Sequence, residues 1–173
     1  MTRYAVLLRG INVGRRKVAM AELREVAEAA GFEDVRTHLN SGNLIIASDH
    51  EAEAVRKLLE PAIAERFGFE VPVVVRTVDQ LRAVLAANPF PDADPSRLII
   101  NFCATAPPPD VLDRMARLAT DAEPVAVVGD EVVVDYRDGI GRSKLAGAGD
   151  KAIGVTATGR NLRTVQKLVE LLT

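Results

Sequence analysis

Residues 4–17, Tyr-Ala-Val-Leu-Leu-Arg-Gly-Ile-Asn-Val-Gly-Arg-Arg-Lys, join a short apolar run to a basic, glycine-bearing loop. The run over 4–9 is too short for a helix and ends at a glycine, which predicts a buried β-strand. Apolar residues then recur at helical spacing from Met20 to Ala30, and Gly31 stands where helices commonly end. The chain is therefore expected to begin with a strand, a polar loop and a helix.

A pair of strands is expected next. Residues 35–39 and 43–47 are rich in strand-forming side chains and flank the cluster Asn40-Ser41-Gly42-Asn43. Asparagine, serine and glycine favour tight turns, so this cluster predicts the connection between the two strands.

A second helix and a fourth strand complete the first half. Ser48 and Glu51 have the spacing of a capping box ahead of an amphipathic helix that ends at Gly68, and Pro61 is expected to kink or split that helix. Residues 71–76 then read as a further strand. The order β-α-β-β-α-β is typical of a ferredoxin-like unit.

The second half repeats part of this order after a proline-rich segment at 88–96. Its expected elements are a strand, a helix, a hairpin, a glycine-rich segment and a final amphipathic helix, at 98–102, 111–118, 125–128 with 132–136, 137–159 and 162–172. We therefore expect an α+β protein with two ferredoxin-like halves, residues 1–90 and 91–173. The apolar stripe of the last helix needs a partner, so the two halves are expected to fold as one cooperative unit.

The composition is that of a globular intracellular protein. Of the 173 residues, 48% are apolar and 27% are charged, which excludes a disordered charged chain. The apolar runs are far too short to cross a bilayer, and a single cysteine, Cys103, permits no internal disulfide. These features predict a cytoplasmic protein without a membrane partner.

Charge is distributed unevenly along the chain. Residues 1–21 contain five basic residues and no acid, and residues 151–173 contain four basic residues and one acid, while the net charge of the whole chain is −2. If the fold brings the two ends together, they form a basic patch on an acidic body, which suits an anion. The alternative is that these side chains only solvate surface loops.

Three polar segments interrupt the apolar elements: 9–17, 40–43 and 139–144, with Arg160 and Asn161 further on. A glycine-bearing loop that leads into a helix offers backbone N–H groups to an anion, and nearby arginine or lysine adds charge-assisted bonds. We expect the segments to meet in one cleft. The candidate ligand contacts are Arg9, Asn12, Lys17, Ser41, Asn43, Arg142, Ser143, Lys144, Arg160 and Asn161.

Each candidate also has a purely structural interpretation. The first two segments can be ordinary turns, and Asn161 is equally well placed to cap the last helix. No Walker A or dinucleotide-binding spacing is present, because Lys144 stands where the third glycine of the latter would be. Two scattered histidines and one cysteine make no zinc set, so no metal or cofactor is expected. No catalytic base or nucleophile can be assigned.

The same segments carry a family resemblance. The chain resembles the bacterial domain of unknown function 1697 family over nearly its whole length, in the motifs Leu7-Leu8-Arg9-Gly10-Ile11-Asn12-Val13-Gly14, Ser41-Gly42-Asn43, Asn88-Pro89-Phe90, Gly139-Ile140-Gly141-Arg142-Ser143-Lys144-Leu145 and Arg160-Asn161. The resemblance implies an α+β fold of two ferredoxin-like halves and no established activity. The family usually has a tryptophan where Leu162 stands and an aromatic residue where His38 stands, so ligand stacking at those positions is not expected here.

Three functions remain open from the sequence. The first is binding of a small phosphate-bearing or other anionic ligand in the basic cleft. The second is a nucleic-acid-binding module that uses the same patch, although only 4% of the residues are aromatic and none is tryptophan. The third is a structural or interaction protein, for example a homodimer, in which the loops only lock the halves together.

Overall fold

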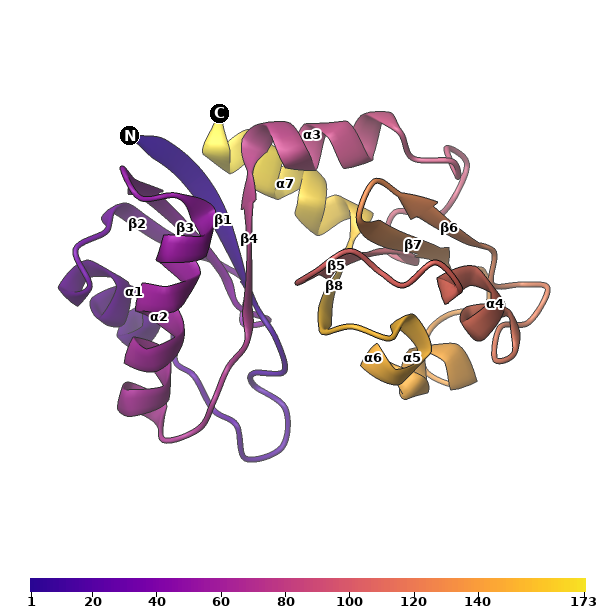
Figure 1. The fold of residues 1–173 in the computed structure, drawn as a ribbon, viewed down its shortest axis with the longest axis horizontal. Helices are drawn as coiled ribbons and strands as arrows, with labels where there is room; N and C mark the ends of the chain where they lie inside the picture. Colours follow the sequence, from indigo (N-terminus) through magenta and orange to yellow (C-terminus); the bar gives the residue numbers. More distant parts are fainter. The chain divides into compact units, whose positions relative to one another are not determined.

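The computed structural model describes residues 1–173 and contains two four-stranded antiparallel sheets and seven helices (Figure 1). Contacts between residues divide the chain into two units, Met1–Leu81 with Leu168–Thr173, and Arg82–Lys167. The α+β class expected from the sequence is confirmed. The element order within each unit is consistent with two ferredoxin-like halves.

The first unit carries one of the sheets. Its strands are β1 (Thr2–Leu8), β2 (Glu33–His38), β3 (Asn43–Ser48) and β4 (Val73–Thr77), and its helices are α1 (Met20–Ala29) and α2 (Ala52–Phe67). The strand order is β2-β3-β1-β4, so β1 and β3 are central and β2 and β4 lie at the edges. Helix α3 (Val78–Ala86) follows β4 directly.

The core of this unit lies between the sheet and its two helices. Alternate residues of the central strands, such as Val6 in β1 and Ile46 in β3, pack against Leu23 of α1 and Leu59 of α2, and all four are fully buried. Every residue of β3 is buried. A central strand covered on both faces reads as a continuous apolar run rather than an alternating one.

One expectation about α2 is wrong. Ser48 does not cap the helix; its hydroxyl accepts a hydrogen bond from the N–H of His50, and Glu51 occupies the N-cap position without a side-chain bond. The reason is that the helix begins at Ala52, too far along the chain for Ser48 to reach its first N–H groups. Of the two outcomes expected at Pro61, a kink or a split, the split does not occur: α2 runs unbroken from Ala52 to Phe67, and Pro61 is exposed, so the hydrogen bond it cannot donate lies on the solvent side.

The second unit carries the other sheet. Its strands are β5 (Leu98–Cys103), β6 (Val125–Val128), β7 (Glu131–Asp135) and β8 (Ala157–Asn161), and its helices are α4 (Val111–Ala116), α5 (Lys144–Ala148) and α6 (Asp150–Ile153). The strand order is β6-β7-β5-β8. Helix α7 (Leu162–Leu172) follows β8, and its residues from Leu168 onward belong to the first unit.

Strand β8 and the helices α5 and α6 were not expected from the sequence, which indicated only a glycine-rich segment at 137–159. The strand, Ala-Thr-Gly-Arg-Asn, has neither an apolar run nor an apolar alternation. Gly159 is required by the neighbouring strand, since a Cβ there would lie 2.9 Å from Cγ2 of Ile99 and 3.1 Å from Oδ1 of Asn101. Glycine weakens a strand signal, so the pairing partner, β5, decides this element.

The spacing of Thr77 and Gln80 in the sequence is that of a capping box, and the pattern over 125–136 is that of a hairpin; the structure contains both. Thr77 and Gln80 form a reciprocal capping box at α3, in which the N–H of Thr77 donates to Oε1 of Gln80 and the N–H of Gln80 donates to Oγ1 of Thr77. The turn is one residue shorter than expected: Glu131 pairs with Val128 and begins β7, so only Gly129, with φ of +59°, and Asp130 join the two strands. None of the seven helices is long and apolar enough to cross a membrane.

Candidate functional site

Asn12 holds two of the polar segments together in the first unit. Its Nδ2 donates to the carbonyl oxygens of Val18 at 3.0 Å and of Asn40 at 2.6 Å, and its Oδ1 accepts from the N–H of Val18 at 2.9 Å. Asn12 has φ of +55°, a conformation that asparagine tolerates better than most residues. One side chain therefore braces the loop over 9–17 and fixes it to the turn at 40–43.

Arg16 is used inside the same loop. Its Nε donates to the carbonyl of Gly10 at 2.8 Å, and its Nη2 donates to the carbonyl of Glu70 at 2.6 Å. The guanidinium lies 4.7 Å from the centre of the Phe69 ring, within cation–π range. Arg16 therefore ties the loop to the segment before β4.

The turn at 40–43 packs tightly against the first loop. Gly42 has φ of +90°, and a Cβ at this position would lie 2.6 Å from Cδ1 of Ile11. Asn43 is fully buried, and its Nδ2 donates to the carbonyl of His38 at 2.8 Å and to Oγ of Ser41 at 3.3 Å. These contacts give the turn a structural role.

Two cations of the braced loop face solvent. Arg15 and Lys17 are exposed, and neither forms an ion pair with a carboxylate. Val13 and Leu39, on the loop and the adjoining turn, are also exposed, at 58% and 54%. Leu39 has φ of +63°, which costs strain in a non-glycine residue and is found mostly where the surrounding structure imposes it. The result is a fixed basic surface with two exposed apolar side chains, which we call the loop pair (residues 9–17 and 39–43).

The third segment, in the second unit, is organised by a buried carboxylate. Oγ of Ser143 accepts a hydrogen bond from the N–H of Ala146, which caps α5, and the same hydroxyl donates to Oε2 of Glu123. The N–H of Thr120 donates to Oε1 of Glu123 at 3.0 Å. Burial by itself would raise the pKa of Glu123, but the hydrogen bonds from Ser143 and Thr120 outweigh it and hold the pKa below its ordinary value.

This carboxylate also acts on a buried phenol. Tyr136 is 5% exposed, and burial together with the charge of Glu123 raises its pKa to about 12. Because its hydroxyl bonds both the N–H of Ala146 and the carboxylate of Glu123, Ser143 caps α5 and links that helix to the loop before β6. Arg142 and Lys144, on either side of it, are exposed and form no ion pair.

Arg160 and Asn161 lie at the end of β8. Arg160 is buried, and its Nη1 donates to Oγ1 of Thr158 at 2.7 Å and to the carbonyl of Gly159 at 2.8 Å. Burial lowers the pKa of Arg160 to about 10. Oδ1 of Asn161 accepts from the N–H of Thr164 at 2.9 Å, which confirms it as the cap of α7.

The structure thus brings together the segments at 9–17 and 40–43, and places those at 139–144 and 160–161 in the second unit. The expected cleft that joins all of them stays a prediction. Two residues of these sites were not among the candidates from the sequence. Arg15 was marked only by its place in a basic stretch, and no sequence pattern marked Glu123. No group of three histidine, cysteine, aspartate or glutamate side chains is arranged to hold a metal ion.

Comparison with known proteins places the chain in a family. Residues 1–133 match the family described as "Protein of unknown function (DUF1697)", and the chain belongs to this family. The structure is similar to one described as that of a conserved bacterial protein from Streptococcus pneumoniae, with a TM-score of 0.81 and 27% sequence identity over 99% of this chain and 98% of the other. No curated protein matches. The resemblance stated from the motifs is confirmed, and it assigns no activity.

Proposed function

We propose that this member of a family of unknown function binds a compact phosphate-bearing anion on its loop pair. The observation that carries the proposal is the Asn12 brace, which fixes a loop that contains four basic residues and no acid. Within that loop, Arg15 and Lys17 are exposed and have no carboxylate partner. A rigid loop with unneutralised cations can bind an anion at a small entropic cost.

Arg16 supports the same role indirectly. Its bonds to the carbonyls of Gly10 and Glu70 hold the chain on both sides of the exposed cations. The ordering of the loop is therefore already complete before a ligand arrives. Most of the affinity then comes from charge-assisted bonds to Arg15 and Lys17, with Arg9 and the hydroxyl of Ser41 as further candidate contacts.

A compact anion fits this surface better than a long polyanion. The basic residues are concentrated at the start and end of the sequence, and the intervening residues 22–150 carry an excess of acid. A ligand with two or three charges can remain on the loop pair, whereas a nucleic acid extends over many phosphates and meets acidic surface.

The test compares thermal stabilisation by inorganic pyrophosphate, by a nucleoside triphosphate and by a single-stranded oligonucleotide. We expect the two small phosphates to raise the melting temperature, and Lys17→Gln to reduce this rise. The matched control is Lys57→Gln, an exposed lysine on α2 outside the loop pair. Lys144→Gln, measured in the same assay, shows whether the segment at 139–144 also contributes to the stabilisation by small phosphates.

Three results would contradict the proposal. One is the absence of any stabilisation by the small phosphates. Another is an equal loss with Lys17→Gln and Lys57→Gln, which would indicate unspecific charge screening. The third is tight oligonucleotide binding with a steep salt dependence, which would favour the nucleic-acid alternative.

A further inference from the structure

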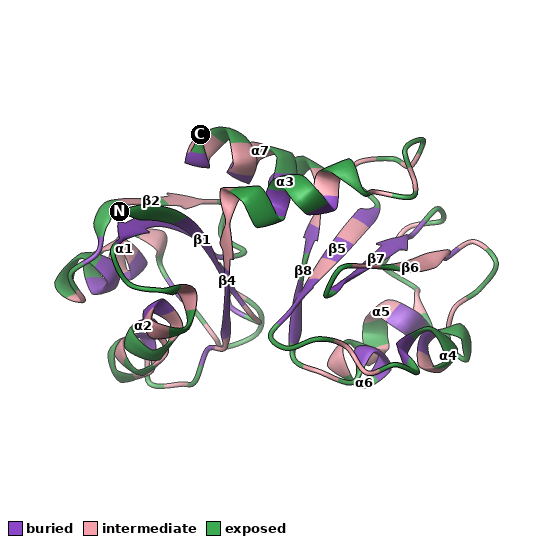
Figure 2. Ribbon diagram, turned by 45° about the horizontal axis from the view of Figure 1, so that its top comes forward, coloured by how far each residue is buried: buried purple, intermediate pink, exposed green.

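Strand β6 is an edge strand with an unusual composition. It has a neighbour on one side only, β7, and reads Val-Ala-Val-Val over 125–128 (Figure 1). The strand contains no charge, no proline and no bulge, which are the devices that commonly protect sheet edges. Figure 2 shows β6 as intermediate and exposed beside the fully buried β7.

The other sheet edges differ from β6. Strand β2 is charged, contains an irregularity between Glu33 and Arg36, and has a positive φ at Asp34. Strand β4 is buried at its three valines, and β8 is buried at Ala157, Thr158 and Arg160. Only β6 combines an apolar sequence with an accessible edge.

The register fixes which backbone groups point away from the sheet. The N–H of Asp135 donates to the carbonyl of Pro124, so the even-numbered residues of β6, Ala126 and Val128, exchange hydrogen bonds with β7. The N–H and C=O groups of Val125 and Val127 therefore point to the open edge. Val127 is also 39% exposed, so an incoming strand can reach it.

Acidic residues flank this edge strand in sequence, and the basic residue beside its start, Arg137, pairs with Asp135. Residues 118–136 contain five acids, Asp121, Glu123, Asp130, Glu131 and Asp135, and no lysine, arginine or histidine. The two that are exposed, Asp121 and Asp130, stand before and after the strand. Antiparallel pairing of β6 with a second copy of itself would set these acidic flanks against each other, which is unfavourable.

We propose that β6 binds an extended segment of a partner protein by strand addition, and that this segment carries lysine or arginine on both sides of a short apolar core. The main-chain groups of Val125 and Val127 supply the hydrogen bonds, and the alternating side chains of the partner cover Val127. Asp121 and Asp130 select basic flanks. This surface is independent of the anion site proposed for the loop pair.

The experiment uses two labelled nine-residue peptides with the same alternating valine–threonine core. One has two basic residues at each end and the other has two glutamates at each end. We expect the basic peptide to bind the full chain, to bind more weakly as salt increases, and to shift the backbone amide resonances of Val125 and Val127. The glutamate peptide should not bind.

Three variants sharpen the test. Val127→Pro removes an N–H that faces away from β7, so it should abolish peptide binding with little effect on the melting temperature. Asp130→Lys should weaken binding of the basic peptide by about three- to tenfold. Asp92→Lys, the same charge change at an exposed position in the proline-rich segment, is the matched control and should leave binding unchanged.

The proposal is overturned if both peptides bind equally, if Asp92→Lys weakens binding as much as Asp130→Lys, or if the amides of Val125 and Val127 do not shift. It is also overturned if the chain alone forms a dimer that Val127→Pro dissociates, because β6 would then pair with a second copy. Should Val127→Pro fail to fold, the comparison of Asp130→Lys with Asp92→Lys still decides between these outcomes.

Discussion

Gly42 is the single residue on which the geometry of the loop pair depends most directly. It needs a positive φ, and a side chain there would collide with Ile11 and with Cβ of Leu8, which lies 2.9 Å from the position of the missing Cβ. Gly68, the C-cap of α2, also has a positive φ, +81°, but nothing lies within 4 Å of its missing Cβ. A comparison of substitutions at the two glycines therefore separates the cost of the backbone conformation from the cost of a steric clash.

We therefore expect Gly42→Ala to destabilise the protein more than Gly68→Ala. The change at Gly68 should cost about 1 kcal/mol for the left-handed conformation alone. The change at Gly42 adds the cost of displacing buried Ile11, about 1–3 kcal/mol more. Urea unfolding of both variants measures the difference, and equal losses would show that the loop can move aside without cost.

Tyr136 gives the protein a sensitivity to high pH. Its pKa in the folded state, about 12, exceeds the ordinary value of 10.0 because of burial and the charge of Glu123. The folded state therefore retains the phenolic proton where the unfolded state loses it, and stability is lost as the pH rises from 10 towards 12. Tyr136→Phe should show a smaller loss of stability over this interval.

Glu123→Gln checks the electrostatic part of that argument. Removing the charge should lower the pH at which the Tyr136 phenolate forms, measured by its ultraviolet absorbance. An unchanged phenolate titration in Glu123→Gln would mean that burial alone sets the pKa.

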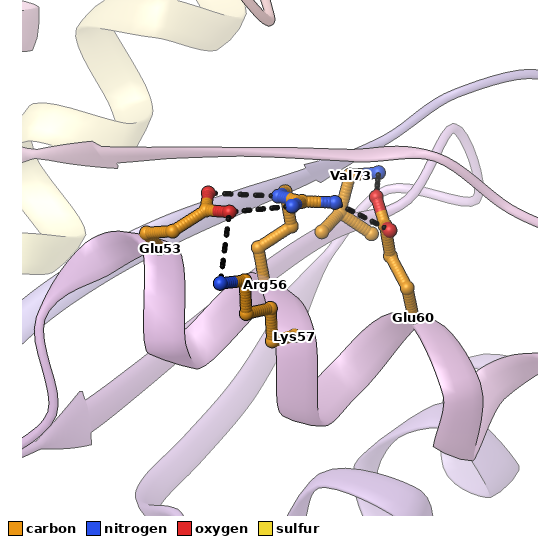
Figure 3. Close-up of polar contacts among 5 residues, drawn as sticks. All are labelled: Glu53, Arg56, Lys57, Glu60 and Val73. Atoms are coloured by element: carbon orange, nitrogen blue, oxygen red, sulfur yellow. Dashed lines mark hydrogen bonds and ion pairs between the residues drawn. The ribbon is translucent and has the colours of Figure 1, made fainter.

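At the scale of secondary-structure elements, a charge network joins helix α2 to the edge strand β4 (Figure 3). Arg56 donates to both carboxylate oxygens of Glu53 and, through Nη1, to Oε2 of Glu60 at 2.8 Å. The other oxygen of Glu60 accepts from the N–H of Val73 at 3.1 Å, at the first residue of β4. The hydrogen bond from Arg56 lowers the pKa of Glu53, which keeps this carboxylate charged.

We expect Glu60→Ala to loosen the start of β4, because the N–H of Val73 and the guanidinium of Arg56 both lose an acceptor. The loss of a hydrogen bond to a charged group is typically about 1–3 kcal/mol. Hydrogen exchange at the Val73 amide should become faster, while Glu65→Ala, a change at an exposed position of the same helix, should leave it unaltered. Unchanged protection of Val73 in Glu60→Ala would show that pairing with β1 alone holds this end of β4.

At the scale of the whole molecule, the first unit is discontinuous in sequence. It includes the last six residues of the chain, and Nη2 of Arg36 in β2 donates to the carbonyl of Leu171 at 2.8 Å. Leu168 and Leu172 are buried, at 0% and 4% exposed. Residues 1–81 therefore lack part of their packing when the end of the chain is absent.

We expect a fragment truncated after Pro95 to be molten or aggregated, which is what folding as one cooperative unit requires. Calorimetry or a thermal melt followed by near-ultraviolet circular dichroism tests this directly. A sharp and reversible transition in the fragment would show that residues 1–95 fold alone and that the two halves are separable.

The elements that were predicted correctly are those whose signals are local. The capping box of Thr77 and Gln80 spans four residues, and α1 was predicted from its apolar spacing and Gly31. The failures are of two kinds. Ser48 and Glu51 have the spacing of a cap but the helix begins elsewhere, and β8 has no apolar pattern because Gly159 is required by the facing side chains of β5.

The sequence by itself determined the α+β class, the family and the segments that carry polar and basic residues, because each depends on composition or on motifs read along the chain. Tertiary structure alone decided what those residues do. Asn12 reaches Asn40, Arg16 reaches Glu70 and Ser143 reaches Glu123, and these pairs are 28, 54 and 20 residues apart in sequence. Hydrogen bonds over such separations depend on how the strands pair and the loops pack, which no local pattern encodes, so only the folded chain distinguishes the bracing side chains from the exposed cations.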